Sequence, residues 1–438
     1  MQVGAASLRE GCGEGELSRL GKLIESREPG SSLPGEFYTS GEVFEEDLRR
    51  VFHDNWLFAG HACEIPAAGD YFTLAVGDES LIIVRDGEGE IHAHFDVCRH
   101  RGSRLTTCER GRARALICPY HQWVYGPDGR LTNARLMGEG FDESRYRLGS
   151  AALREVEGLL FVCLAPRAVP DFEPFAEALR PQLAPHGLDE ARIIARHRYE
   201  VAANWKVLVE NNRECYHCRV SHPEFCASNY DLGLPGDTRS GSGYDETLRR
   251  EYARWRAAGL FPRDVSFPGG APYRISRLPL KDGYLTESLD GSLVAPLMGS
   301  LTSPETGSLR LITLPNLWAH ANCDYAMTTR LLPLAPERTR VDVSFLVRED
   351  AVEGVDYSAE RVAHVWKATS EEDWELCENN QRGLRSRAHE PGPLSTLTER
   401  SVEQFVEWYL RELSRDGDVN GVGRSEKEIS RSAWQIWK

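Results

Sequence analysis

The sequence predicts an α+β protein, in which a small antiparallel β domain is followed by a larger domain of antiparallel strands and long helices. In residues 38–166, short apolar runs alternate with turns that contain Gly, Asp and Pro, a pattern typical of antiparallel strands. Beyond residue 166 the apolar runs lengthen, and two of them show the spacing of an amphipathic helix. The change in pattern predicts two domains.

Strands of the first domain are expected where β-branched and aromatic residues run between turn signals. The turn at 86–89 should join two of these strands as a hairpin. The expected strands cover residues 71–76, 80–85, 91–97, 113–119 and 159–165.

The second domain is expected to combine strands at 310–320 and 339–347 with helices at 358–386 and 401–414. The last of these has the clearest apolar spacing, which predicts one buried face. A further short helix is expected at 16–26. The chain then divides into an N-terminal extension at 1–37, a first domain at 38–166, a second at 167–415 and a C-terminal tail at 416–438.

Composition narrows the classes of function. The chain has 438 residues and a net charge of −15, which argues against binding to nucleic acid through phosphates. It contains no run of eighteen apolar residues and begins without the pattern of a signal peptide, so a cytoplasmic protein without membrane contact is expected. For such a protein the 11 cysteines predict reduced thiols or metal ligands rather than a disulfide framework.

The clearest motif pairs cysteine with histidine in two short loops. The first loop, CRHRG, contains Cys98 and His100. The second loop, CPYHQW, contains Cys118 and His121. Neighbouring hairpins could bring these thiolates and imidazoles together, which predicts a metal site.

Two kinds of metal centre use two cysteines and two histidines. One is a structural zinc site, and the other is a Rieske [2Fe–2S] cluster. Because each loop supplies one residue of each type, the motif suits two adjacent irons, with Cys98 and Cys118 on one and His100 and His121 on the other. The Cys-x-His loop is too tight for a zinc finger, so we expect the cluster, with zinc as the alternative.

A second motif, ENNRECYHCRVSHP, contains His217 and His222. On one continuous helix these residues would not share a face, but Pro223 favours an end to the helix between them. Glu214 lies one turn before His217 and could orient its imidazole. Helical spacing directs Cys218 away from His217, so we do not expect a further metal site there.

Two histidines and one carboxylate form the ligand set of O₂-activating Fe(II) sites. The carboxylate is expected from the helix at 358–386, and we select Asp373. Spacing alone also allows Glu371, Glu372 or Glu375.

With both motifs present, residues 38–415 resemble the catalytic (alpha) subunits of Rieske non-haem iron oxygenases. The resemblance implies a Rieske domain followed by a helix-grip catalytic domain. It implies an O₂-dependent oxidoreductase with a [2Fe–2S] cluster and a mononuclear Fe(II) bound by His217, His222 and Asp373.

The family also implies a homotrimer, in which Glu214 would connect His217 to His121 of the neighbouring subunit and carry electrons between them. Most members have Asp at this position, where this chain has the longer Glu. Ser103 and Tyr120 stand where Rieske proteins of respiratory complexes carry an extra disulfide. In this respect the chain resembles the oxygenase type of Rieske protein, whose cluster has the lower reduction potential.

Glu214 and the segments 210–218, 350–357 and 377–409 resemble the branch of glycine-betaine and stachydrine demethylases. This branch hydroxylates an N-methyl carbon of a quaternary amine, and the product releases formaldehyde. Aromatic faces would hold the quaternary ammonium group by cation–π attraction. The aromatic candidates in the second domain are Trp205, Tyr216, Tyr273, Tyr284, Trp318, Tyr325 and Trp366.

Electrons are expected from a separate reductase. The Gly-rich segment at 11–15 follows no strand, so it is a poor nucleotide-binding candidate, and no flavin or NAD(P)H domain is recognisable. A reductase with flavin and its own iron–sulfur cluster would pass on electrons from NAD(P)H. Two alternatives stay open: an oxygenase acting on another small molecule, such as an aromatic or a biosynthetic intermediate, and a Rieske electron carrier without the second iron.

Overall fold

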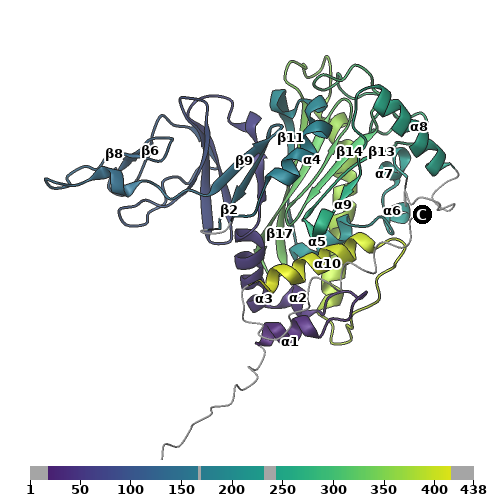
Figure 1. Cartoon of the computed structure of the whole chain (residues 1–438), viewed down its shortest axis with the longest axis horizontal. Helices are drawn as coiled ribbons and strands as arrows, with labels where there is room; N and C mark the ends of the chain where they lie inside the picture. Colours follow the sequence, from purple (N-terminus) through teal and green to yellow (C-terminus); the bar gives the residue numbers. More distant parts are fainter. Residues whose placement is uncertain (1–17, 166–168, 231–242, 416–438) are drawn as a thin grey trace, which may run out of the picture.

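The computed structural model describes residues 18–165, 169–230 and 243–415. Two lobes lie along the long axis of the molecule (Figure 1). The smaller lobe is built from strands, and its far tip carries β6 (Leu116–Ile117) and β8 (Leu131–Asn133). The larger lobe combines a broad antiparallel sheet with helices. The predicted α+β class is therefore confirmed.

The smaller lobe contains three antiparallel sheets. Their strand orders are β4-β3-β2-β5, β6-β7-β8 and β1-β10-β9. The remaining strands are β1 (Leu57–His61), β2 (Asp70–Val76), β3 (Glu79–Arg85), β4 (Ile91–Phe95), β5 (Arg110–Arg112), β7 (Val124–Tyr125), β9 (Ala152–Val156) and β10 (Leu159–Cys163).

Four of the five strands expected here are confirmed as β2, β3, β4 and β10. The strand expected at 113–119 is wrong, because only Leu116–Ile117 is extended. On one side, the Ala113 N–H donates to the Gly69 carbonyl at 2.9 Å. On the other, the Cys118 N–H donates to the Trp123 carbonyl at 2.8 Å, which begins a loop instead of continuing the strand.

The larger lobe is organised around one seven-stranded antiparallel sheet of order β11-β17-β16-β15-β14-β13-β12. The single strand expected at 310–320 is wrong, because Pro315 and Asn316 form a turn between β14 and β15 and a proline cannot donate to a ladder. The strand expected at 339–347 is confirmed as β17. The strands are β11 (Ala191–Val201), β12 (Val265–Ser266), β13 (Tyr273–Leu278), β14 (Ser308–Thr313), β15 (Leu317–Ala321), β16 (Ala326–Ala335) and β17 (Arg338–Arg348).

Both long helices expected near the C-terminus are confirmed, as α9 (Ala359–Leu384) and α10 (Arg400–Leu413). The helix expected at 16–26 corresponds to α1 (Arg19–Glu25), although residues 16 and 17 and the predicted tail at 416–438 lie outside the described residues. None of the helices in the described ranges has the length and apolar character that a membrane crossing requires. The other helices are α2 (Glu36–Thr39), α3 (Gly41–Glu46), α4 (Glu173–Leu183), α5 (Trp205–Asn212), α6 (Cys218–Ser221), α7 (Pro223–Ser228) and α8 (Tyr244–Ala257).

The large sheet is buried on both faces. Leu309 and Leu311 of β14 belong to a core cluster that also contains Leu179 of α4. Side chains on the opposite face belong to the main core, which contains Trp366 and Trp374 of α9. The sheet is therefore enclosed between α4 and α9, and the candidate iron ligands lie on the α9 side.

A buried ion pair holds α5, the helix that leads to the second motif. Lys206 contacts the Asp47 carboxylate, and both side chains are fully buried. The Trp205 indole donates to the same carboxylate at 2.9 Å, and the Tyr409 hydroxyl of α10 donates at 2.6 Å. Because Asp47 lies outside α5 and α10, it links three segments that are distant in sequence.

We expect Lys206→Met to lower the unfolding free energy by roughly 3–5 kcal/mol, because removal of one partner leaves a buried charge uncompensated. The matched control is Lys367→Met, which breaks an exposed pair with Glu371 at 3.0 Å and should cost about 0–1 kcal/mol. Denaturant and thermal unfolding of the two variants provide the measurement. Equal losses of stability in both variants would contradict the role given to the Asp47 pair.

Candidate metal centres

The two Cys/His loops of the smaller lobe close with the same backbone pattern. In the first, the Cys98 N–H donates to Ser103 O and the Gly102 N–H donates to Cys98 O, both at 2.9 Å. In the second, the Cys118 N–H donates to the carbonyl five residues on at 2.8 Å, and the Gln122 N–H donates to Cys118 O at 3.0 Å. Gly102 and Gln122 occupy equivalent positions, and both have positive φ. The loops thus present their cysteines in matching ways.

The four side chains of these loops come together at the tip of the smaller lobe. The rings of His100 and His121 lie 4.5 Å apart between centroids, and Cys98 and Cys118 are each only 2% exposed. Burial raises the pKa of the Cys98 thiol, and the adjacent Cys118 raises it further. A bound metal would favour the thiolate form of Cys98 against this rise in pKa.

Two aromatic residues support this group from behind. The His100 ring stacks on Trp123 at 4.9 Å. The Tyr125 hydroxyl lies 3.3 Å from Cys98 Sγ and accepts the Arg99 N–H at 3.0 Å, so it is placed to donate to the sulfur of a Cys98 thiolate. Sequence reasoning missed Tyr125, because only the fold brings β7 behind Cys98. Within the described ranges the buried His100 Nδ1 has no hydrogen-bond partner, as expected of an atom that faces a metal.

In the larger lobe, His217 and His222 stand at the two ends of the short helix α6. Neither residue is inside the helix, so the predicted interruption near Pro223 is present, and Pro223 begins α7. The two imidazoles face Asp373 of α9, whose Oδ1 lies 3.3 Å from His217 Nε2 and 3.0 Å from His222 Nε2. One carboxylate oxygen therefore approaches both rings.

Each imidazole also has a carboxylate on its other nitrogen. Glu214 Oε1 lies 2.6 Å from His217 Nδ1, and Glu372 Oε2 lies 2.8 Å from His222 Nδ1. This arrangement directs the Nε2 lone pairs toward Asp373 and is typical of metal-binding histidines. Glu372 was a competing ligand on spacing alone, but its carboxylate contacts His222 from behind, and Glu371 instead pairs with Lys367.

The charges and burial of His217, His222 and Asp373 are typical of a site that binds a cation. Although burial alone lowers the pKa of His217, the Asp373 and Glu214 carboxylates raise it to about 9. In the part of the chain that the structure describes, His222 Nε2 and Asp373 Oδ1 are buried without a well-formed hydrogen bond. Two imidazole nitrogens and a carboxylate oxygen that converge within 3.3 Å, with both imidazoles oriented by a second carboxylate, fit a divalent metal.

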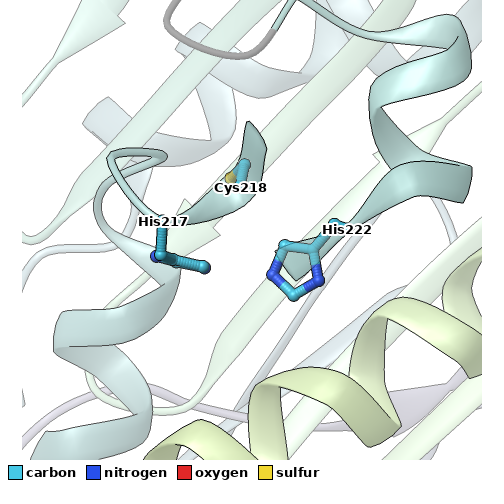
Figure 2. A group of neighbouring side chains, drawn as sticks. All are labelled: His217, Cys218 and His222. Carbon is cyan, nitrogen blue, oxygen red and sulfur yellow. The ribbon is translucent and has the colours of Figure 1, made fainter. Parts of the chain in front are cut away.

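Cys218 lies closer to this group than helical spacing suggested. Its Sγ and the nearest nitrogens of His217 and His222 all lie within 4.8 Å of one another (Figure 2). The expectation that Cys218 points away from His217 is wrong, because His217 precedes α6 instead of forming part of it. Cys218 is nevertheless bonded to Cys215, so its sulfur is not available as a metal ligand.

The Cys215–Cys218 bond also corrects the expectation of reduced thiols for this pair, whose Cα atoms are only 5.0 Å apart across a tight turn. Seven further cysteines lie outside both motifs and are expected to be reduced thiols; of these, Cys12 lies outside the described residues. The others are free, as expected: Cys63, Cys108, Cys163, Cys226, Cys323 and Cys377.

Comparison with known proteins finds a different family model in each half of the chain. Residues 55–149 match the Rieske [2Fe-2S] domain, and residues 188–415 match the catalytic domain of the ring-hydroxylating alpha subunit. Over 389 residues the chain is 42% identical to the glycine betaine monooxygenase oxygenase subunit of Chromohalobacter salexigens, covering 88% of this chain and 87% of that protein. It is 34% identical to the carnitine monooxygenase oxygenase subunit of Escherichia coli over 201 residues, 45% of this chain and 54% of that one.

Among solved structures, the quaternary ammonium Rieske monooxygenase CntA in complex with γ-butyrobetaine has the same fold. The TM-score is 0.66 at 21% identity, with 90% of this chain and 98% of that chain covered. The family matches and the long alignment with a 42% identical relative establish the class of the protein. The chain belongs to the Rieske non-haem iron oxygenases, as a catalytic alpha subunit with a Rieske [2Fe–2S] cluster and a mononuclear iron.

Proposed function

We propose that this enzyme removes an N-methyl group from a quaternary ammonium substrate of the betaine type. The observation that carries the proposal is the 42% identity to a glycine betaine monooxygenase oxygenase subunit over nearly the whole length of both chains. In the reaction, one atom of O₂ enters a C–H bond of the N-methyl group, and the other leaves as water with two electrons and two protons. The resulting N-hydroxymethyl group releases formaldehyde and a proton, leaving a tertiary amine.

The ligands proposed for the cluster are Cys98 and Cys118 on one iron and His100 and His121 on the other. Their convergence at one tip, the matching backbone of the two loops and the partnerless His100 Nδ1 support this choice. The bound cluster would store one electron for transfer to the mononuclear iron.

The ligands proposed for the mononuclear iron are His217, His222 and Asp373. The iron, when bound, supplies the chemistry of O₂ activation. Glu214 and Glu372 would hold the two imidazoles in the tautomer that leaves Nε2 free. The convergence of these ligands also argues against a simple electron carrier, which would need none of them.

We also propose that the enzyme acts as a head-to-tail homotrimer. Within one chain, the tip that carries β6 and the segment around α6 lie at opposite ends of the molecule (Figure 1). Both ends expose apolar side chains, since Tyr120 is 55% exposed and Tyr216 is 66% exposed. A ring of three chains would bring each tip to the next catalytic lobe, where Glu214 could connect His217 to His121 of the neighbouring subunit.

A separate reductase would supply the electrons in this scheme. The relatives of this chain are named as oxygenase subunits, which supports a second protein that carries flavin and takes electrons from NAD(P)H. The position of the second Cys/His loop fits this arrangement, because β6, which directly precedes Cys118, lies at the tip of the smaller lobe (Figure 1).

The proposed reaction is tested with a surrogate reductase, NADH and a panel of N-methylated amines. We expect oxygen uptake coupled one-to-one to formaldehyde with at least one betaine-type substrate, because hydroxylation of one N-methyl carbon consumes one O₂. An oxygen electrode and a formaldehyde assay provide the measurement. Formaldehyde from none of the quaternary amines, with turnover of an aromatic compound instead, would overturn the proposal.

We expect Tyr125→Phe to lower the reduction potential of the cluster, since the hydroxyl hydrogen bond to Cys98 Sγ stabilises the more negative reduced state. A net hydrogen bond of roughly 0.5–1.5 kcal/mol corresponds to a one-electron shift of roughly 20–60 mV. Redox titration followed by EPR measures the shift. Tyr146→Phe is the control. The Tyr146 ring packs against the same hydrophobic core as Tyr125, with its centroid 4.8 Å from that of Phe141, and its substitution should leave the reduction potential unchanged. A potential that is unaltered in Tyr125→Phe contradicts the assignment.

Asp373→Ala and Glu214→Gln should separate metal binding from electron transfer. We expect Asp373→Ala to contain two irons per chain and to keep the Rieske absorption, because it loses only a ligand of the mononuclear site. Glu214→Gln should keep all three irons but lose most of its turnover. Elemental analysis and single-turnover kinetics distinguish the two, and Glu375→Ala, an exposed change on the same helix, is the control. Three tightly bound irons in Asp373→Ala would show that the carboxylate ligand is another residue.

A further inference from the structure

Two charged or polar side chains interrupt the apolar packing between the large sheet and α9. Arg310 and His320 are paired neighbours on β14 and β15, and their side chains lie on the α9 face. The His320 ring lies 4.3 Å from Trp366, and the Arg310 guanidinium lies 5.7 Å from the Phe225 ring centroid. Buried polar groups in an otherwise apolar layer mark a candidate binding site when they converge.

This polar group lies close to the proposed iron ligands in the fold. Trp366 precedes Asp373 by seven residues, so both side chains project from one face of α9, about 10 Å apart along its axis. Phe225 follows His222 by three residues on α7. The Phe225 and Trp366 rings meet edge to face, with centroids 5.6 Å apart. These two aromatic residues therefore lie between the proposed iron ligands and Arg310.

The other aromatic candidates have different environments. Trp205 is fully buried and donates to Asp47. The Tyr325 hydroxyl donates to a backbone carbonyl in the core. The Tyr273 hydroxyl donates to the Pro174 carbonyl on the far side of the sheet. Tyr216 is exposed. Trp366 has a stronger geometric case than these four, because its ring contacts both Phe225 and His320.

The Glu287 carboxylate lies next to the indole N–H of Trp366. Its buried carboxylate accepts from His320 Nδ1 at 3.0 Å, Asn322 Nδ2 at 3.1 Å and Trp366 Nε1 at 3.1 Å. Although burial opposes ionisation, the charge and hydrogen bond of His320, followed by Arg310, lower the pKa of Glu287 to about 2. The carboxylate is therefore ionised and already saturated with donors.

Arg310, in contrast, keeps unused hydrogen-bonding capacity. Its Nη2 donates to Asn229 Oδ1 at 2.5 Å and lies 3.9 Å from Glu287, too far for a good hydrogen bond. Within the described part of the chain its buried Nε has no partner. A buried donor without a partner costs about 1–3 kcal/mol, and a guanidinium matches a carboxylate by its planar fork of donors.

We propose that Arg310 binds the carboxylate of a zwitterionic quaternary ammonium substrate, while Phe225 and Trp366 contact its cationic end beside His222 and Asp373. This inference rests on the proposed function and adds the recognition of both charges of the substrate. The carboxylate would select betaines over cationic amines without an acid group. The aromatic faces, with Glu287 behind them, would select the ammonium end.

Two substitutions separate the two halves of this site. Arg310→Lys keeps the charge but loses the planar fork, and we expect it to raise KM and Kd for glycine betaine roughly 10- to 100-fold. Inhibition by choline, which has the trimethylammonium group without the carboxylate, should keep the wild-type Ki in Arg310→Lys. Phe225→Leu should raise both the KM for glycine betaine and the Ki for choline. Arg340→Lys, a partly buried arginine of the same sheet paired with Asp342 at 3.0 Å, should change none of them.

Kd values measured by calorimetry report binding without turnover, so a failure of this binding site can be distinguished from a failure of the proposed reaction. A wild type that binds glycine betaine in an Arg310-dependent way but releases no formaldehyde would support this site and contradict the proposed reaction. An unchanged Kd in Arg310→Lys overturns the inference, and so does an equal loss of affinity for betaine and choline, which indicates a structural role. Failure of the wild type to bind glycine betaine, with binding of choline intact, also overturns it.

Discussion

The structure of the larger lobe depends on the placement of one carboxylate, Asp373, against two imidazoles. A buried carboxylate is costly unless positive charge and hydrogen-bond donors compensate it. Asp373 lies within 3.3 Å of both His217 and His222, on a helix of 26 residues that spans the sheet. The imidazoles flank a helix of four residues, and α5 leads to them. Because α5 is itself fixed by the buried Asp47 pair, contacts far from the site limit where the imidazoles can lie.

The charges around His217 also couple the protonation of its imidazole to metal binding. Without a cation, the carboxylates around His217 hold its pKa at about 9, so at neutral pH the imidazole carries the positive charge that Asp373 requires. A metal bound by His217 would take the place of that proton as the source of positive charge, so metal binding would release a proton. In this structure Glu214 and Glu372 contact the Nδ1 atoms of His217 and His222. These contacts orient the two rings from the side away from Asp373.

Motif spacing predicted the α+β class, both long helices and the two groups of residues that converge in the structure, because local sequence fixes loops and helix faces. It failed where neighbouring segments decide the outcome. The run at 113–119 is apolar enough for a strand, but contacts at each end turn it into a loop. Tyr125, Glu372 and Arg310 carry no motif, since their roles come from strands and helices that meet only after folding. The Cys215–Cys218 bond was missed because compartment and composition, rather than the tight turn, guided the expectation.

The two lobes meet opposite demands on solvent exposure. A cluster that receives electrons from another protein has to lie near the surface, and the Cys/His loops do so at the end of the chain's longest axis (Figure 1). A site that activates O₂ has to exclude water, and His222, one of its proposed ligands, is only 1% exposed. One chain satisfies both demands by keeping the two centres apart. In the proposed homotrimer, a neighbouring subunit would bring its Cys/His loops to the catalytic lobe, so assembly would become a condition of the chemistry.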